Sequence, residues 1–402
     1  MASYIIILAS ALIVLSYLFS IVQKKTHIPS VLMLIIAGYL IKHIASYSLQ
    51  FTYVIPFNLL KILGTIGLVL IVLEGVLELK ITRKDLPIIK RAFFIGSLVA
   101  IVSSLIISCI LMSFYHNTFF NSLLYAIPLS IVSSAILIPS IHKLSDGTKK
   151  TMTYESIFSD IIGIFLFYFL VNNTVFSFKV IPTLAINIIA MLLISLLFSF
   201  ILIFIISRID GNARIMLTIS ILLLVYNLCK IVNLSALLVI LVFGIIINNF
   251  HYFLKILKVP VFLGNLFDKS GLAIATSELK QLNAEITFFI RTFFFLVFGY
   301  SLDMGMLFNN NVILIGTIIV IVIYLIRYMY FKFLHTSVYP EIFMAPRGLI
   351  TILLFYSIPE NSLAGGGDAG VMYFTVIVTI IIMSLSLIII PKQSPVDKGL
   401  GS

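Results

Sequence analysis

Long apolar stretches without charged residues recur from one end of this 402-residue sequence to the other. A helix rises about 1.5 Å per residue, so about 20 apolar residues cross the hydrocarbon core of a membrane, which is about 30 Å thick. Hydrophobic residues make up 61% of the chain and charged residues 10%, which is far more apolar than one soluble domain of this length requires. The sequence therefore predicts an all-α polytopic membrane protein.

About thirteen stretches have the length and composition of membrane spans. They lie near residues 2 to 22, 29 to 47, 58 to 79, 92 to 114, 121 to 142, 152 to 171, 180 to 207, 214 to 229, 235 to 250, 284 to 302, 311 to 331, 339 to 358 and 370 to 391. The stretch from 251 to 283 mixes charged and apolar residues, and we expect it to form an amphipathic connection at the inner membrane surface.

The loop charges give the orientation. Lys and Arg cluster in the loops of one side, whereas the loops of the other side hold only Lys42, Lys61, Lys179 and Lys230. Because basic loops stay on the cytoplasmic side, we expect the N-terminus outside the cell (inner) membrane and the C-terminus in the cytoplasm. This loop pattern also accounts for the net charge of +11, so no nucleic-acid partner is expected.

Two groups of three successive spans, 92 to 171 and 311 to 391, enter the membrane from opposite sides. The middle span of the first group contains Pro128 and Pro139, and that of the second contains the run Pro346-Arg347-Gly348. Inverted repeats with interrupted middle helices are typical of secondary transporters, whose broken helices cross near an ion site at the midplane. The alternative is that these prolines only kink ordinary membrane helices. The matched positions of the breaks favour two crossing discontinuous helices.

Asp160 is a carboxylate about ten residues beyond Lys149 and Lys150, with apolar sequence after it. This spacing puts it roughly 15 Å deep in the membrane, near the midplane. A charge at such a depth is costly, so it predicts a functional role. The alternative is a carboxylate that a neighbouring helix neutralises for packing alone.

Hydroxyl groups near Asp160 suit a monovalent cation, because alkali ions bind oxygen ligands. Ser156 lies four residues before Asp160 on the same helix face, and Ser159 is its neighbour. We predict a site for Na⁺ or K⁺ made of Asp160, Ser156 or Ser159, and oxygens of Ser133 and Ser134 in the first broken span. Serines in membrane helices also commonly bond to their own helix or sit at close helix contacts, and that alternative applies to each of them.

The remaining buried charges can be matched by depth. Glu155 and Arg327 lie at similar depths on the cytoplasmic side of the midplane, so we predict an ion pair that acts as a structural strut. Glu74 and Arg291 both fall in the inner half of their spans and are candidates for a second pair. Arg347 is a further intramembrane charge, within the second break.

Several of these motifs occur together in a known family. Glu155-Ser156-Ile157-Phe158-Ser159-Asp160 resembles the Glu-Ser-x-x-Asn-Asp signature of the sodium/proton exchanger (NhaP/NHE-like) family of the monovalent cation:proton antiporter superfamily. The runs Leu70 to Leu79, Phe289 to Gly299 and Ala345 to Ile350 are similar to other stretches of that family, and Arg327 falls where the family has a basic residue. Two positions depart from the pattern: Ser159 replaces Asn, and Ser133-Ser134 replaces Thr-Asp-Pro or a similar sequence.

The resemblance implies one membrane transporter domain with the inverted-repeat antiporter fold, assembled as a homodimer. It implies a scaffold of about residues 1–90 and 210–305 that carries the dimer interface, a linker span near 180–207, and a moving core of about 91–171 and 311–391. The ligands of such a transporter would be the transported Na⁺ or K⁺ and H⁺, and no other cofactor is implied. The lipid bilayer would surround the protein.

A single carboxylate at the site leads to a mechanism. Asp160 can hold a proton or a cation but not both, so alternating access would exchange one for the other. With Arg327 permanently charged and Ser159 neutral, we expect an electroneutral 1:1 exchange, with Na⁺ as the first choice and K⁺ as the alternative. A solute:cation symporter with a related fold is a further alternative. An enzyme is not expected, because every histidine falls at a loop or span end: His27, His43, His116, His142, His251 and His335.

Overall fold

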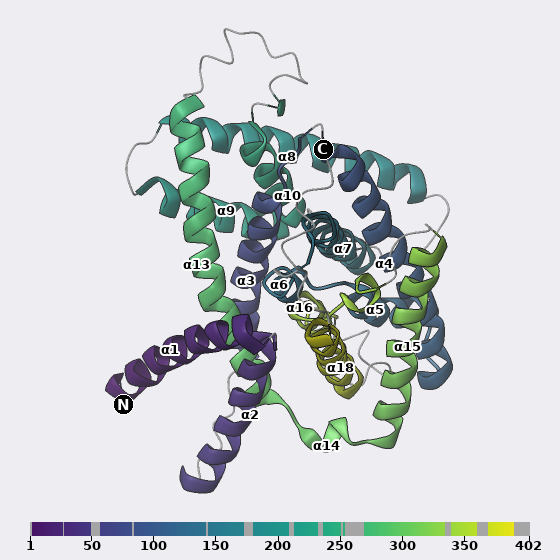
Figure 1. The fold of residues 1–402 in the computed structure, drawn as a ribbon. Coiled ribbons are helices and arrows are strands. Elements are labelled where there is room, and N and C mark those ends of the chain that lie inside the picture. The colour runs from purple at the N-terminus through teal and green to yellow at the C-terminus, as the bar shows by residue number, and fades with distance from the viewer. Residues whose placement is uncertain are drawn as a thin grey trace. The chain divides into compact units, whose positions relative to one another are not determined.

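The computed structural model describes most of the chain, and every element assigned in the described part is a helix (Figure 1). The described residues are 2–26, 28–49, 57–82, 84–141, 144–172, 180–208, 213–231, 236–250, 252–253, 269–333, 339–359 and 369–389. The predicted all-α fold is therefore confirmed.

Chain contacts divide the molecule into two compact units. The first consists of residues 1–60, 88–160 and 292–402, and the second of residues 61–87 and 161–291. The assignment of scaffold, core and linker segments stays a prediction.

Most of the described helices belong to the first unit. They are α1 (Ala2–Thr26), α2 (Ser30–Leu49), α4 (Leu86–Tyr115), α5 (Phe119–Ser130), α6 (Ser134–Leu137), α14 (Met304–Leu307), α15 (Asn310–Phe333), η1 (Glu341–Phe343), α16 (Leu349–Phe355) and α18 (Ala369–Ile389). The second unit contains most of α3 (Phe57–Glu78), together with α8 (Val180–Arg208), α9 (Ala213–Ile231) and α10 (Ala236–Asn248). Two further helices, α7 (Asp146–Asn172) and α13 (Lys269–Ser301), contribute residues to both units.

Six helical segments of the described chain are long and apolar enough to cross a membrane. They are Leu86–Tyr115, Phe119–Leu137, Asp146–Val171, Leu272–Ser301, Asn310–Phe333 and Ala369–Ile389. Shorter apolar helices are Ser10–Gln23, Ser30–Ile44, Leu193–Ser207, Ile215–Cys229 and Val239–Asn248. Each predicted span overlaps a helix, and the two middle spans that carry helix breakers are interrupted.

The second half of the predicted connection between 251 and 283 is not separate from the span that follows it. From Lys269 the chain forms a single helix, α13, which continues to Ser301. Leu272, Ala275 and Leu279 are buried in this part of α13, and this spacing gives the helix an apolar stripe that packs inward. The charges that suggested a surface position include Lys280, which is half-exposed and pairs with Glu78. Residues 254–268 lie outside the described chain.

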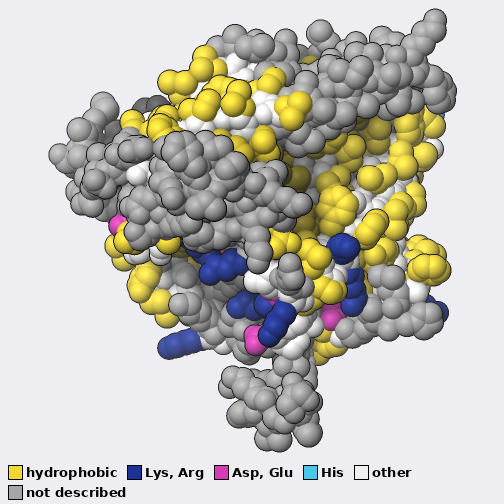
Figure 2. All heavy atoms as spheres, turned by 90° about the horizontal axis from the view of Figure 1, so that it is seen from above, with side chains coloured by type: hydrophobic (Ala, Val, Ile, Leu, Met, Phe, Trp, Pro, Cys, Tyr) yellow, Lys and Arg dark blue, Asp and Glu magenta, His cyan; other side chains and the backbone are white. Residues whose placement is uncertain are grey.

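Many large apolar side chains of the described residues are exposed. Figure 2 shows hydrophobic side chains over much of the described surface on the face that it draws, while Lys and Arg side chains and a few acidic ones gather in its lower part. Val14, Phe94 and Ile321 of the first unit are 60%, 64% and 58% exposed. Exposed apolar surface on this scale is unfavourable in water and is expected where lipid surrounds the helices.

The broken helices form the centre of the first unit. All side chains from Ser122 to Leu137, and all from Met344 to Phe355, are buried. A helix that is apolar on every side must be surrounded by protein or lipid, and these segments are enclosed by protein. Helix α16 packs against α5 and α18, and α18 packs against α15.

Two glycines allow α2 and α13 to touch through their backbones. A Cβ added to Gly38 would lie 2.9 Å from the backbone nitrogen of Tyr300, and a Cβ added to Gly299 would collide with the backbone of Ile35. Backbone atoms cannot move aside as side chains do, so close helix contacts of this kind require small residues.

Replacing Gly299 with alanine should therefore force the two helices apart. We expect Gly299→Ala to lower the free energy of unfolding by about 1 to 3 kcal/mol, measured by titration with sodium dodecyl sulfate in detergent micelles. Gly147→Ala is the matched control, because nothing lies within 4 Å of a Cβ added at Gly147. Equal losses in the two variants would contradict the proposed contact.

Candidate functional site

Two interrupted helices meet at the centre of the first unit. Helix α5 ends at Ser130, and α6 begins at Ser134 after an extended link. Between η1 and α16, residues 344–348 are also outside any helix. The backbone N–H of Ser133 in the first break donates to the carbonyl of Pro346 in the second, at 2.8 Å. The predicted crossing of two discontinuous helices is therefore present.

The first break does not lie at Pro128 itself. Pro128 is inside α5, and the chain leaves the helix three residues later at Ile131, which is extended.

Gly348 in the second break allows close contact with the first break, because a Cβ added to it would lie 2.6 Å from Ser133 Oγ and closer still to the Ile136 side chain. Only glycine fits this contact between the two breaks.

Arg347 satisfies the carbonyl groups that the first break exposes. The last carbonyls of a helix have no partner within that helix. Arg347 is fully buried and donates from Nε to Leu129 O at 2.8 Å and from Nη2 to Ser130 O at 3.1 Å. It also donates from Nη1 to Ala345 O at 2.8 Å, and its own backbone N–H donates to Thr379 Oγ1 at 3.0 Å. The guanidinium thus joins both breaks and places positive charge at the carbonyl end of α5, where it is favourable.

A lysine cannot replace this fork of donors, because its single ammonium group cannot reach three carbonyls in different directions. We expect Arg347→Lys to lower the free energy of unfolding by about 2 kcal/mol, from the loss of hydrogen bonds to a charged donor. Arg91→Lys, at an exposed position of α4, should change it little. The comparison uses the same detergent titration as above, and equal stability of the two variants would rule out this function of Arg347.

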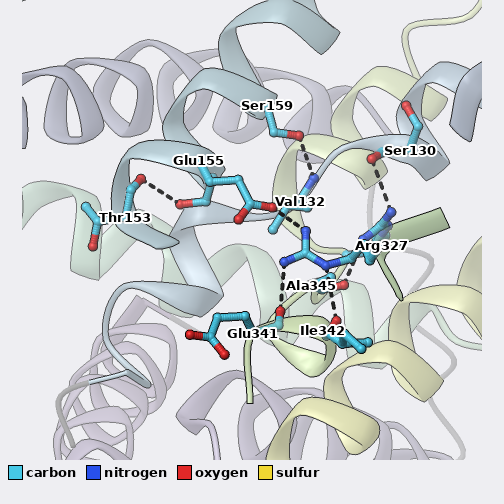
Figure 3. Close-up of polar contacts among 11 residues, drawn as sticks. Ser130, Val132, Thr153, Glu155, Ser159, Arg327, Glu341, Ile342 and Ala345 are labelled. Atoms are coloured by element: carbon cyan, nitrogen blue, oxygen red, sulfur yellow. Dashed lines mark hydrogen bonds and ion pairs between the residues drawn. The ribbon is translucent and has the colours of Figure 1, made fainter. Parts of the chain in front are cut away.

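Asp160 on α7 faces the first break. The backbone N–H of Ser134 donates to Asp160 Oδ2 at 3.3 Å. Asp160 Oδ1 and Ser133 Oγ are both buried and have no hydrogen-bond partner among the described residues. The neighbouring hydroxyl of Ser159 accepts the backbone N–H of Val132 at 3.0 Å, as Figure 3 shows.

The structure thus brings four of the five predicted site residues together, whereas the hydroxyl of the fifth, Ser156, is bonded within its own helix. Asp160, Ser159, Ser133 and Ser134 lie at the first break. Ser156 is fully buried, but its hydroxyl donates to the carbonyl of Thr153 in its own helix at 3.0 Å. For Ser156 the alternative of a bond to its own helix is the observed one, because a serine hydroxyl competes for nearby backbone carbonyls.

Glu155 and Arg327 contact each other, as their matched depths predict. Arg327 Nη1 donates to Glu155 Oε1, and both side chains are buried. Arg327 also donates from Nε to Ile342 O at 3.1 Å and from Nη2 to Glu341 O at 2.9 Å. Figure 3 shows the guanidinium between Glu155 on one side and Glu341 and Ile342 on the other. The pair therefore ties α7 and α15 to η1, directly before the second break.

The second unit holds the other predicted pair. Arg291 Nη2 lies 3.0 Å from Glu74 Oε2 and 3.3 Å from Oε1. One turn further along α3, Glu78 lies 3.1 Å from Lys280 Nζ. These contacts link α3 to α13 within that unit.

The chemistry of the first break is limited by its groups. It offers one carboxylate with a free oxygen and several hydroxyl oxygens, in a buried setting. No cluster of three or more His, Cys, Asp or Glu that could hold a metal occurs among the residues that the structure describes. A single carboxylate with hydroxyl neighbours suits a proton or a hard monovalent cation.

Comparison with known proteins connects this arrangement to a family. The model of the family described as sodium/hydrogen exchanger, transmembrane, matches residues 8–392. No curated protein matches the sequence. The chain is similar to the structure of the sodium proton antiporter MjNhaP1 from Methanocaldococcus jannaschii at pH 8, with a TM-score of 0.70 and 17% identity over 96% of this chain and 99% of that chain.

An electron-microscopy map of the same antiporter is also similar, with a TM-score of 0.66 and 18% identity over 96% of this chain and 95% of that chain. At these identities the likeness shows the fold alone. The inverted-repeat antiporter fold predicted from the sequence is confirmed by it.

Proposed function

The chain belongs to the sodium/hydrogen exchanger family and is a multi-pass integral membrane protein, and on this premise we propose that it exchanges a monovalent cation for protons at Asp160. The observation that carries the proposal is the free oxygen of a buried carboxylate, Asp160 Oδ1, at a crossing where Ser133 Oγ is also without a partner in the described chain. Buried polar atoms are nearly always paired, so two free ones at one site call for a ligand.

The exchange follows from the single carboxylate. When Asp160 is protonated it is neutral and does not attract a cation, and when it holds a cation it cannot also hold a proton. Alternating access of the loaded site to the two membrane faces then moves one ligand in each direction. Only the two loaded states cross, so the two fluxes are coupled.

The proposed cation ligands are Asp160, Ser133, Ser134 and Ser159. Ser159 Oγ has a lone pair left after it accepts the N–H of Val132. Ser156 is left out of this set, because its hydroxyl is engaged with Thr153 in its own helix. Na⁺ is the proposed cation, in agreement with the family to which the chain belongs.

We further propose an electroneutral exchange of one cation for one proton. Arg327 is paired with Glu155, and Arg347 is bound to carbonyl groups, so both positive charges are held by fixed partners. The site therefore carries the same net charge with a proton as with a monovalent cation. A homodimer with its N-terminus outside and its C-terminus in the cytoplasm remains part of this proposal, supported by the loop charges and the family resemblance.

Purified protein in liposomes tests the proposal. A preset pH gradient should be dissipated when Na⁺ is added, and parallel additions of K⁺ and Li⁺ rank the cations. The rate should not change when the membrane potential is clamped at different values. Absence of a response to any of the three cations would overturn the exchange, and a reversal potential that requires two protons per cation would overturn the 1:1 stoichiometry.

A further inference from the structure

Three buried hydroxyl groups on facing helices have no hydrogen-bond partner in the described part of the chain. They are Ser122 Oγ and Tyr125 Oη on α5 and Thr351 Oγ1 on α16, in side chains that are 0%, 2% and 1% exposed. Helix α16 packs against α5, and the ring of Tyr125 contacts that of Phe355 with 5.6 Å between centroids. These three residues are called the hydroxyl strip below.

Some buried hydroxyls of the same unit are paired with their own helix, whereas Ser103 Oγ, Tyr324 Oη and Ser386 Oγ on other helices are also without a partner in the described chain. Ser130 Oγ, also on α5, donates to Ile127 O at 2.7 Å, and Thr375 Oγ1 on α18 donates to Val371 O at 2.8 Å. A serine or threonine in a membrane helix can always bond in this way to its own helix. The hydroxyl strip differs from the paired residues, and its three groups lie on two helices that pack against each other, so one shared partner can serve them.

The strip leads to the site. Thr351 is three residues beyond Gly348, whose backbone lies against Ser133 Oγ, and Ser133 precedes the residue that binds Asp160. Ser122 and Tyr125 are three residues apart and therefore share one face of α5. Ser122 is eight residues before the end of α5, about 12 Å along the helix from the break.

The same pattern continues to the beginning of α5. Asn117 Nδ2, just before the helix, is buried and has no partner among the described residues either. Free polar atoms thus occur from the first turn of α5 to the crossing.

An unpaired polar group inside a membrane protein is costly, because hydrocarbon offers no hydrogen bonds. Water is a partner that can serve several such groups at once, since a buried water commonly makes about three hydrogen bonds. The side chains of Ser133, Ser134 and Ser159 at the site are short and offer one hydroxyl oxygen each. Water that accompanies a cation to the site would supply it with further oxygen ligands.

We propose that the hydroxyl strip holds water between α5 and α16, and that the cation and the proton travel along it between Asp160 and the membrane face at which α5 begins. This inference rests on the proposed exchange at Asp160. With the N-terminus outside, that face is the outer one.

Thiol chemistry tests the hydration directly. In a background with Cys109→Ser and Cys229→Ala, Thr351→Cys should react with a membrane-impermeant methanethiosulfonate at least about tenfold faster than Thr375→Cys, because a thiol ionises and reacts only where it meets water. The reaction should occur from the face at which α5 begins and should slow when Na⁺ is present. Equal rates for the two cysteines, or reaction only from the opposite face, would overturn the inference.

Transport gives an independent measurement. Thr351→Val and Tyr125→Phe keep the shape of each side chain and remove its hydroxyl, so the apparent affinity for the cation should fall about three- to tenfold. Thr351→Ser, which keeps the hydroxyl, and Thr375→Val, which removes a paired one, should retain the normal affinity. Unchanged affinity in Thr351→Val and Tyr125→Phe would contradict the strip.

The two proposals can fail separately. If the unmutated protein exchanges no cation, the proposed function fails, while the thiol rates still report whether water reaches Thr351. If exchange is normal but Thr351→Cys is as slow as Thr375→Cys, the hydroxyl strip alone is wrong.

Discussion

Asp160→Asn is expected to abolish cation-dependent proton movement while the protein still folds. Asparagine keeps the size of the side chain and its bond from Ser134, but it can neither release a proton nor neutralise a cation. The rate at which Na⁺ dissipates a pH gradient in liposomes should fall at least about 100-fold, because the amide lacks the charged form on which both ligands depend. Removing a buried charge carries no cost of its own, so the unfolding midpoint in detergent should not fall.

The control for this experiment is Ser130→Ala. Ser130 is buried close to the same break, but its hydroxyl is bound to the carbonyl of Ile127. Its removal should leave the transport rate within about a factor of two. A hydroxyl that is already paired with its own helix contributes only about 1 kcal/mol, and this contribution is to the stability of the fold rather than to ion binding. An Asp160→Asn variant that retained more than about one tenth of the normal rate would show that another group carries the proton.

Breaking the pair of Glu155 and Arg327 is expected to produce the largest loss of stability. Either Glu155→Gln or Arg327→Gln leaves a charge buried without its partner, which costs about 3 to 5 kcal/mol. Arg327→Gln should be the more severe, because Arg327 also binds the carbonyls of Glu341 and Ile342. The double variant removes both charges and should lose less than the sum of the single losses, by up to about 3 kcal/mol.

Glu78 and Lys280 provide a matched control cycle. Their side chains are 41% and 40% exposed, and an exposed pair contributes about 0 to 1 kcal/mol. Titration of all variants with sodium dodecyl sulfate gives both coupling energies under the same conditions. A coupling between Glu155 and Arg327 no larger than that between Glu78 and Lys280 would mean that the buried contact does not hold the helices together.

The buried charges of the first unit have separate tasks in this interpretation. Arg347 donates hydrogen bonds to the carbonyl groups at the end of α5, and Arg327 is held by Glu155 and by backbone carbonyls. Because these positive groups are engaged, neither is bonded to Asp160 in the described structure. The carboxylate keeps a free oxygen for a ligand that comes and goes.

Much of this arrangement could be predicted because it depends on regular helix geometry. Span lengths follow from the rise of a helix, and residues at equal depths in neighbouring spans can pair, which is how Glu155 was matched to Arg327. The crossing was indicated by helix-breaking residues at corresponding positions of two inverted groups of spans. These signals are local or periodic, so one sequence is enough to read them.

The features that the sequence did not reveal depend on contacts between distant residues. The bonds from Arg347 to Leu129 and Ser130 join segments more than 200 residues apart, and only the fold brings them together. The hydroxyl of Ser156 could have faced either Asp160 or its own helix, and spacing does not distinguish the two. The continuity of α13 is not apparent from the sequence, because the charged residues of its first half are typical of a surface segment, while its buried stripe depends on the neighbour against which it packs.

The most direct test of competition at Asp160 is proton release on cation binding. Purified protein in detergent, in a weakly buffered solution, is mixed with NaCl while the released protons are measured with a pH indicator. If Na⁺ displaces the proton of Asp160, the unmutated protein should release up to about one proton per chain, and Asp160→Asn should release none. No release from the unmutated protein, or equal release from both, would contradict exchange at this carboxylate.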